Sequence, residues 1–229
     1  MPGTAIGERR TNMAISGSTV AIIGTGNIGS KLAANFAAGG QDFLLAGRDP
    51  DEATKVASDL NGHAEVVGID EAVDRAEVLV LAVWLDVFKQ LIAQYSDRLG
   101  GKVIVDPTNA VGPDGSGGYR KVIGEHESSG EILAGLLPAG ARLVKAFGTL
   151  SAPSLAAAAW REPERAVLFY AADDAAAGDL VADLIRAGGY EPVRVGGLDQ
   201  SIRIEMFGDL HEVGGLGRVV TKQEALKAI

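Results

Sequence analysis

Apolar residues occur along the chain in short continuous runs, separated by longer segments in which apolar residues recur with helical spacing. The clearest runs are residues 20–23, 43–46 and 78–83. Continuous apolar runs are typical of strands that are covered on both faces, and strands that alternate with helices indicate a parallel sheet. The pattern therefore predicts an α/β fold with a doubly wound parallel sheet of the Rossmann type and a smaller C-terminal lobe.

The other elements continue this alternation. Further strands are expected at 64–67, 103–106, 142–147, 166–170 and 191–195. Helices are expected after the first strand and at 50–60, 85–98, 153–159 and 174–187, followed by a helical segment at about 199–210. The polar residues 70–75 predict a turn.

Three parts of the chain differ in pattern. Residues 1–18 are polar and lack periodicity, so we expect a disordered or extended segment, with Met13 as an alternative start. Residues 19–150 form the expected dinucleotide-binding domain, and residues 151–229 form a smaller lobe that completes the cleft for a second substrate. The last elements could instead extend the sheet, and the sequence leaves both arrangements open.

A stretch rich in Gly, Pro and Ser, residues 107–130, separates two of the predicted strands. A loop of this length in a compact domain is usually functional or disordered. It begins at the carboxyl end of a strand, where ligands bind in such sheets. We therefore expect a loop that faces the substrate, and a mobile surface insertion is the alternative.

A glycine-rich turn joins the first strand to the first helix. It consists of Gly24, Thr25, Gly26, Asn27, Ile28 and Gly29. In a βαβ unit the first glycine permits a tight turn, the second lets the backbone approach a pyrophosphate, and the third lets the helix pack closely on the strand. The helix N-terminus supplies N–H donors and partial positive charge. The turn therefore predicts a dinucleotide site.

The second strand ends in Gly47 and Arg48, where folds that bind a free adenosine ribose usually place Asp or Glu. A guanidinium instead makes charge-assisted, often bidentate bonds to a 2′-phosphate. Asp49 and Asp51 lie beyond the strand, where acids are ordinary signals for the start of a helix. The sequence therefore favours NADP(H) over NAD(H); a solvated surface role for Arg48 is the alternative.

The ends of two later strands supply candidates for the nicotinamide end of the site. Ala82 and Val83 are small enough to let the nicotinamide ribose lie against the backbone. Trp84 either forms a wall of this pocket or packs in the core. Asn109 either bonds the carboxamide of the nicotinamide or only forms a turn.

No side chain is identified as a catalytic acid or base. His63, His126 and His211 are scattered, without the spacing of a metal site. His211 is the best acid–base candidate, although a capping or surface role is the expectation, and Lys145 is a second possible proton donor. The sequence thus predicts no catalytic side chain and no metal, and favours direct hydride transfer between two flat rings.

Composition narrows the class of protein further. The 229 residues include no cysteine, which excludes disulfides, a thiolate nucleophile and cysteine-based metal sites. The formal charge of −9 argues against a nucleic-acid partner. No apolar run approaches the length that spans a membrane. We therefore expect a cytoplasmic protein whose partner is a small-molecule redox co-substrate.

Together the motifs resemble those of the NADP reductases that depend on the deazaflavin coenzyme F-420 (F420). The resemblance covers roughly residues 20–152 and rests on the glycine turn, on Gly47-Arg48, on Val105-Asp106-Pro107-Thr108-Asn109 and on Val144-Lys145-Ala146-Phe147-Gly148-Thr149. It implies a homodimer that passes a hydride between NADPH and F420, with the two rings face to face.

The resemblance also assigns residues by position. Thr25 to Ile28 would hold the pyrophosphate, Gly47 and Arg48 the 2′-phosphate, and Ala82, Val83 and Ala146 the nicotinamide end. F420 would lie near Asn109 and residues 145–149. This chain departs from the family pattern at Gly47, where Ser or Thr is expected, at Glu52, where a second basic residue is expected, and at Gly148, where Asn is expected.

Two other functions remain open. An NADPH-dependent reductase could use a free flavin, a quinone or a small carbonyl, and a carbonyl would require a proton donor such as His211 or Lys145. A non-catalytic NADP(H)-binding sensor could use the 107–130 loop and residues 207–217 as its interaction surface.

Overall fold

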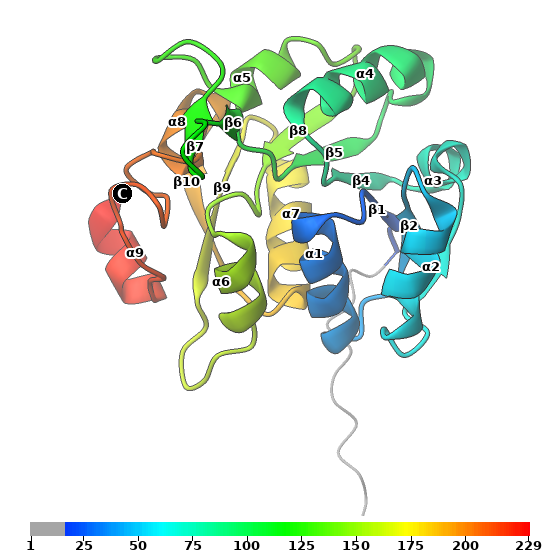
Figure 1. Ribbon diagram of the computed structural model, residues 1–229, viewed down its shortest axis with the longest axis horizontal. Coiled ribbons are helices and arrows are strands. Elements are labelled where there is room, and N and C mark those ends of the chain that lie inside the picture. The colour runs from blue at the N-terminus through cyan, green and yellow to red at the C-terminus, as the bar shows by residue number, and fades with distance from the viewer. Residues whose placement is uncertain (1–16) are drawn as a thin grey trace, which may run out of the picture.

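The computed structural model describes residues 17–229. The predictions for residues 1–16, including the alternative start at Met13, lie outside the described residues. Strand and helix alternate through most of the described chain, and a single eight-stranded sheet crosses the molecule (Figure 1). The α/β fold predicted from the apolar runs is confirmed.

The sheet has the order β10-β9-β8-β5-β4-β1-β2-β3. Its strands are β1 (Val20–Ile23), β2 (Phe43–Ala46), β3 (Ala64–Val66), β4 (Val78–Leu81), β5 (Val103–Asp106), β8 (Arg142–Lys145), β9 (Val167–Ala172) and β10 (Glu191–Gly196). All neighbouring strands are parallel except β8 and β9, which pair antiparallel. The mostly parallel order brings the ends of β1, β4, β5 and β8 to one edge, where the predicted site residues follow the strands.

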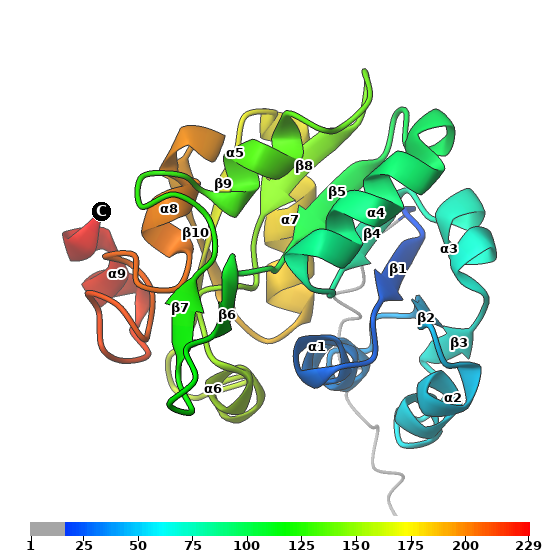
Figure 2. The ribbon, with the colours of Figure 1, turned by 45° about the horizontal axis from the view of Figure 1, so that its top comes forward.

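Helices cover both faces of the sheet (Figure 2). They are α1 (Asn27–Ala38), α2 (Pro50–Ser58), α3 (Ile69–Arg75), α4 (Leu85–Tyr95), α5 (Ser129–Ala134), α6 (Ala152–Ala157), α7 (Ala175–Ala187), α8 (Ser201–Ile204) and α9 (Lys222–Ala228). Alternate residues of β1 point to opposite layers: Val20 and Ile22 join the hydrophobic cluster of α1, α6 and α7, whereas Ala21 and Ile23 join that of α3 and α4. Burial on both faces explains the continuous apolar runs.

Residues 151–229 contribute β9 and β10 to this same sheet, which is one of the two arrangements that the sequence left open. A third hydrophobic cluster joins β9 and β10 to α8 and α9. The proposed boundary at residue 150 stays a prediction. No helix within residues 17–229 is long and apolar enough to cross a membrane.

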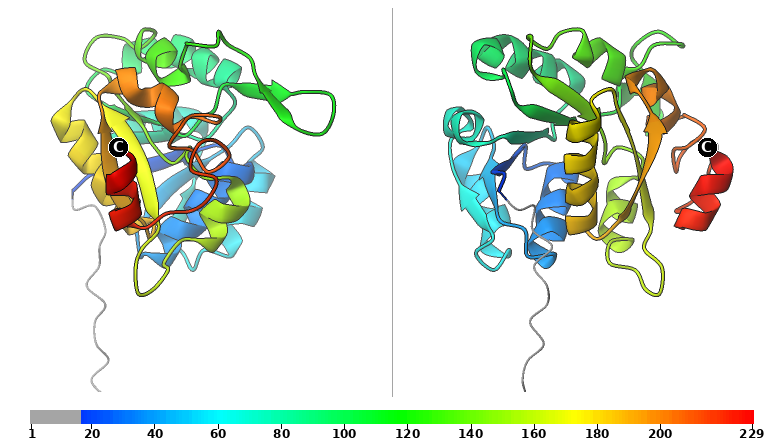
Figure 3. Two further views of the ribbon diagram at one scale, coloured as in Figure 1. Left: turned by 90° about the vertical axis from the view of Figure 1, so that its left-hand side faces the viewer. Right: turned by 180° about the vertical axis from the view of Figure 1, so that it is seen from behind.

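Two local predictions, at residues 70–75 and at 199–210, were wrong, and the 107–130 loop contains strands that were not predicted. Residues 70–75 belong to α3, because Ile69, Ala72 and Val73 recur with helical spacing and pack in the core. The 107–130 loop contains a hairpin of β6 (Val111–Pro113) and β7 (Tyr119–Lys121), which projects from the body of the molecule (Figure 3). The helix expected to continue to residue 210 ends at Ile204.

Candidate active site

Two glycines of the turn after β1 are required by close packing. Gly24 has a φ of +117°, and a Cβ there would lie 2.3 Å from the carbonyl oxygen of Ala82. A Cβ on Gly29 would lie 1.9 Å from the carbonyl oxygen of Gly24. These contacts hold the start of α1 against the ends of β1 and β4, as the glycine pattern predicts.

Gly26 differs from both, because an added Cβ would meet no heavy atom within 4 Å. Gly26 is the exposed N-cap of α1, and no side-chain hydrogen bond caps this helix within the described chain. The first turn of α1 carries no acidic residue, so its partial positive charge is not neutralised locally. We call the turn of residues 24–29 and the open space beside it the glycine cradle. The backbone amides at the start of α1 and the positive potential of the helix N-terminus fit the pyrophosphate of a dinucleotide. Asn27 and Ile28 begin the helix at this cradle.

Gly47 and Arg48 adjoin this cradle. A Cβ on Gly47 would lie 3.2 Å from the side chain of Thr25, which places the end of β2 beside the glycine turn. Arg48 is exposed and forms no ion pair with any residue from 17 to 229. Asp49 is the N-cap of α2 and accepts a hydrogen bond of 2.9 Å from the amide of Asp51. The acid is thus used as a helix cap, and the free cation fits a phosphate better than a ribose hydroxyl.

The residues that follow β4 lie beside the glycine turn. The amide of Ala82 donates to the carbonyl of Ile23 over 2.9 Å, and both Ala82 and Val83 are half-buried. Trp84 is 61% exposed, so its core-packing alternative is wrong, and its role as a wall of the pocket stays a prediction. Ala146 is only 1% exposed, and its place at the nicotinamide end stays a prediction.

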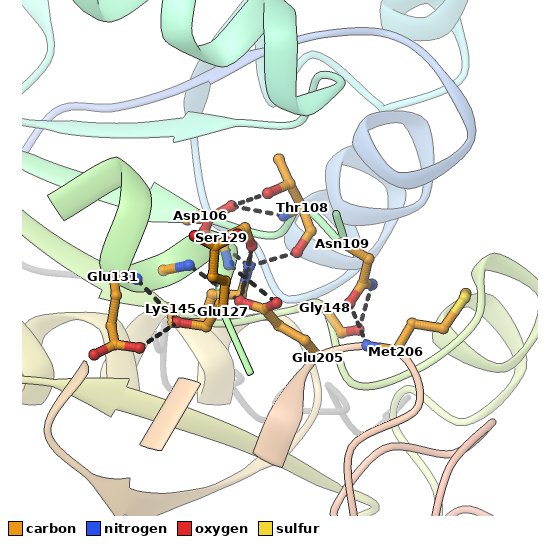
Figure 4. A network of polar contacts seen from close by, with 12 residues as sticks. Asp106, Thr108, Asn109, Glu127, Ser129, Glu131, Lys145, Gly148, Glu205 and Met206 are labelled. Carbon is orange, nitrogen blue, oxygen red and sulfur yellow. Dashed lines mark hydrogen bonds and ion pairs between the residues drawn. The ribbon is translucent and has the colours of Figure 1, made fainter. Parts of the chain in front are cut away.

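Asn109 connects segments that are far apart in sequence (Figure 4). Its Nδ2 donates to the carbonyl of Gly148 over 3.0 Å, and its Oδ1 accepts from the amide of Met206 over 2.6 Å. The side chain therefore does more than form a local turn. Its carbonyl is engaged and one amide hydrogen is free of these two bonds, so the predicted bond to the nicotinamide carboxamide would use that hydrogen.

His211 is buried, so the surface role, one of the two that the sequence suggested, is wrong. Nδ1 accepts a hydrogen bond of 2.9 Å from the amide of Val213, and Nε2 donates to the carbonyl of Gly148 over 3.0 Å. Burial lowers the pKa of His211 and thereby favours the neutral ring. With both nitrogens engaged, the imidazole has no proton to donate to a substrate. His63 instead pairs with Asp42 over 2.7 Å, and His126 is exposed.

Lys145 is also unavailable as a proton donor. Its Nζ donates to Asp106 Oδ2 over 2.8 Å, to the carbonyl of Thr108 over 2.5 Å and to Ser129 Oγ over 2.7 Å, which uses all three ammonium hydrogens. Glu205 Oε1 lies 3.4 Å from the same nitrogen (Figure 4). Ser129, Glu205 and Met206 were not predicted as part of the site from the sequence. A lysine in an otherwise apolar strand was the available signal, because a buried ammonium requires partners.

Residues 19–110 match the family described as NADP oxidoreductase, coenzyme F420-dependent. The F420-dependent NADP reductase of Methanothermobacter thermautotrophicus is 30% identical over 200 residues, which cover 81% of this chain and 84% of that protein. The chain belongs to the family of F420-dependent NADP reductases. It is therefore an NADP-dependent oxidoreductase.

Two solved structures are similar to this chain. The hypothetical protein SMa0349 from Sinorhizobium meliloti is 33% identical, with a TM-score of 0.78 over 90% of this chain and 96% of that one. A protein from Arthrobacter sp. FB24, provisionally named an F420-dependent NADP reductase, is 24% identical, with a TM-score of 0.67 over 80% of this chain and 87% of that one. The latter similarity shows the fold alone.

Proposed function

We propose that this enzyme transfers a hydride between NADP(H) and the deazaflavin coenzyme F420. The observation that carries the proposal is the engagement of His211 and Lys145 within the fold, alongside the relationship to a named F420-dependent NADP reductase. Reduction of a carbonyl needs a positioned proton donor, and these were the two candidates. Transfer between two planar rings depends chiefly on their alignment.

The NADP(H) half of the site consists of the glycine cradle and the guanidinium of Arg48, which is unpaired within residues 17–229. Residues 24–29 hold the pyrophosphate through the amides at the start of α1, and Arg48 holds the 2′-phosphate. The family pattern has a hydroxyl residue at position 47, where this chain has Gly47. Arg48 therefore carries most of the discrimination between NADPH and NADH. The nicotinamide end lies at Ala82, Val83 and Trp84.

Bound NADPH supplies the hydride, and oxidised F420 accepts it together with one proton from solvent. The protein aligns the two rings so that donor and acceptor carbons approach to roughly 3–3.5 Å and water is excluded. Asn109 and the Gly148 carbonyl border the position of the second ring, where their mutual hydrogen bond fixes both segments. No protein side chain forms a covalent bond in this scheme.

The test is anaerobic absorbance spectroscopy of purified protein with NADPH and oxidised F420. We expect loss of the absorbance band of oxidised F420 with NADPH and little loss with NADH. Flavin mononucleotide and a quinone serve as parallel acceptors. NADPH binding without reduction of F420 would contradict the proposal; reduction of another acceptor would then identify a different reductase, and reduction of none would support a sensor. The homodimer implied by the resemblance stays a prediction, which sedimentation analysis can test.

A further inference from the structure

A buried network of charged and polar side chains connects three separate segments of the chain. Lys145 ends β8, Asp106 ends β5, and Glu205 follows α8. All three side chains are at least 95% buried, and Lys145 lies between the two carboxylates (Figure 4). This network takes no part in the proposed hydride transfer, so its place in the fold needs another explanation.

Glu205 is held by more than its ion pair. Oε1 accepts from Ser129 Oγ over 2.8 Å and from the amide of Gly130 over 3.0 Å, and Oε2 accepts from the amide of Ser129 over 3.1 Å. Ser129 Oγ in turn accepts from Lys145. The Glu205 carboxylate is therefore fixed to the start of α5 and to the end of β8 at once.

The residues after Glu205 form a tight turn at the carboxyl end of β5. The amide of Met206 donates to Asn109 Oδ1 over 2.6 Å, and the amide of Gly208 donates to the carbonyl of Glu205 over 2.8 Å. Val80 pairs with Val105, so the residues that follow β4 and β5 lie side by side. The 205–208 turn is thus attached next to the segment assigned to the nicotinamide end.

Phe207 stands out within this turn. Its φ is +76°, a conformation that bulky side chains rarely adopt, and its side chain is 49% exposed. Gly208, which follows, is closely packed, because a Cβ there would lie 2.3 Å from the carbonyl oxygen of Arg203. A strained residue with an exposed aromatic ring, in a turn that is bound to Asn109, is a candidate for a functional contact.

We propose that the Asp106–Lys145–Glu205 network positions the 205–208 turn so that the ring of Phe207 covers the planar ring of the second substrate. Phe207 is then a specificity-determining residue, and Lys145 and Glu205 are positioning residues that act through it. This inference rests on the proposed function. It explains why the chain keeps a costly buried ion network at this point, since alignment of the second ring requires a rigid support.

Equilibrium dialysis of oxidised F420 against NADP-loaded protein tests the contact. Phe207→Ala is expected to weaken F420 binding about tenfold, the upper end of what one aromatic pair contributes, while NADPH binding stays within about twofold. Phe207→Tyr keeps the ring and is expected to bind F420 like the wild type. Val213→Ala removes another exposed apolar side chain of the same segment and serves as the matched control.

Glu205→Gln tests the positioning role, because it removes the charge and keeps the size of the side chain. We expect weaker F420 binding, and we expect the double variant Glu205→Gln/Phe207→Ala to bind F420 no more weakly than Phe207→Ala alone. Such non-additivity shows that Glu205 acts through Phe207. If Glu205→Gln does not fold, Ser129→Ala takes its place in the cycle, since it removes the hydroxyl that bridges Lys145 and Glu205.

The outcomes separate this inference from the proposed function. Wild-type protein that neither binds nor reduces F420 overturns the proposed function and this inference with it. If the wild type reduces F420 and Phe207→Ala binds F420 as tightly as the wild type does, this inference alone is overturned. Additive losses in the double variant overturn the positioning role of the network and leave the contact of Phe207 in place.

Discussion

The buried imidazole of His211 donates a hydrogen bond of 3.0 Å to the carbonyl of Gly148. This bond ties the C-terminal segment to the loop that follows β8. The ring is neutral, because burial lowers the pKa of His211 and its Nδ1 accepts from the amide of Val213. A residue that the sequence offered as an acid–base candidate is therefore a structural link between two segments of the site.

This relationship predicts a pH dependence of stability. The folded pKa lies below the ordinary value of 6.5, so between these two pKa values the unfolded chain binds more protons and stability falls as the pH falls. We expect the free energy of unfolding, measured in urea, to decrease from about pH 7.5 to about pH 5.5, and to decrease less in His211→Gln. His126→Gln, at an exposed position, should keep the wild-type slope. If the free energy of unfolding of His211→Gln falls with pH as steeply as that of the wild type, buried His211 is not the source of the pH dependence.

Arg48→Glu should change the cofactor preference. Replacing the guanidinium removes a charge-assisted bond to the 2′-phosphate and adds repulsion, so we expect NADPH binding to weaken by about 30- to 100-fold and NADH binding by less than about threefold. Isothermal titration with both cofactors measures the ratio. Lys227→Glu changes an exposed cation on α9 by the same amount and is the control for net charge. Equal losses for the two cofactors would refute the 2′-phosphate assignment.

Gly26 and Gly29 should respond in opposite ways to a larger side chain. Gly26→Val projects into open space, so we expect stability within about 1 kcal/mol of the wild type and dinucleotide binding weakened about 100-fold or more. Gly29→Ala meets the carbonyl oxygen of Gly24, so we expect destabilisation of about 3 kcal/mol, the upper end of the usual overpacking cost. Thermal unfolding and cofactor titration measure both effects. Wild-type affinity in Gly26→Val would show that the cradle does not hold the pyrophosphate.

Lys145→Met should destabilise the fold strongly. The substitution leaves the carboxylates of Asp106 and Glu205 buried without their common cation, which is expected to cost about 3–5 kcal/mol in urea unfolding. Lys222→Met breaks the ion pair with Glu191, in which Lys222 is 60% exposed, and should cost less than about 1 kcal/mol. A similar small loss in both variants would mean that the buried network is not fully charged.

Much of the fold could be predicted because its signals are local. Strands β1, β4 and β5 are covered on both faces, so their sequences are continuously apolar. The glycine turn could be identified for a similar reason, since Gly24 and Gly29 meet backbone atoms that any βαβ unit places there. Asp49 likewise acts as the helix cap that its position suggests. The β6–β7 hairpin was missed because its two strands have only three residues each, and α3 was mistaken for a turn because only three of its seven residues are apolar.

The sequence by itself determined the strand and helix alternation, the glycine cradle and the arginine beside it, because each depends on residues that are close neighbours along the chain. Only the tertiary structure decided the surroundings of Lys145 and His211. Ser129 and Glu205 are 76 residues apart, and His211 is 63 residues from Gly148, so no local pattern reports these contacts. Whether a titratable side chain is free to react depends on burial and on partners, and both arise only when distant segments pack together.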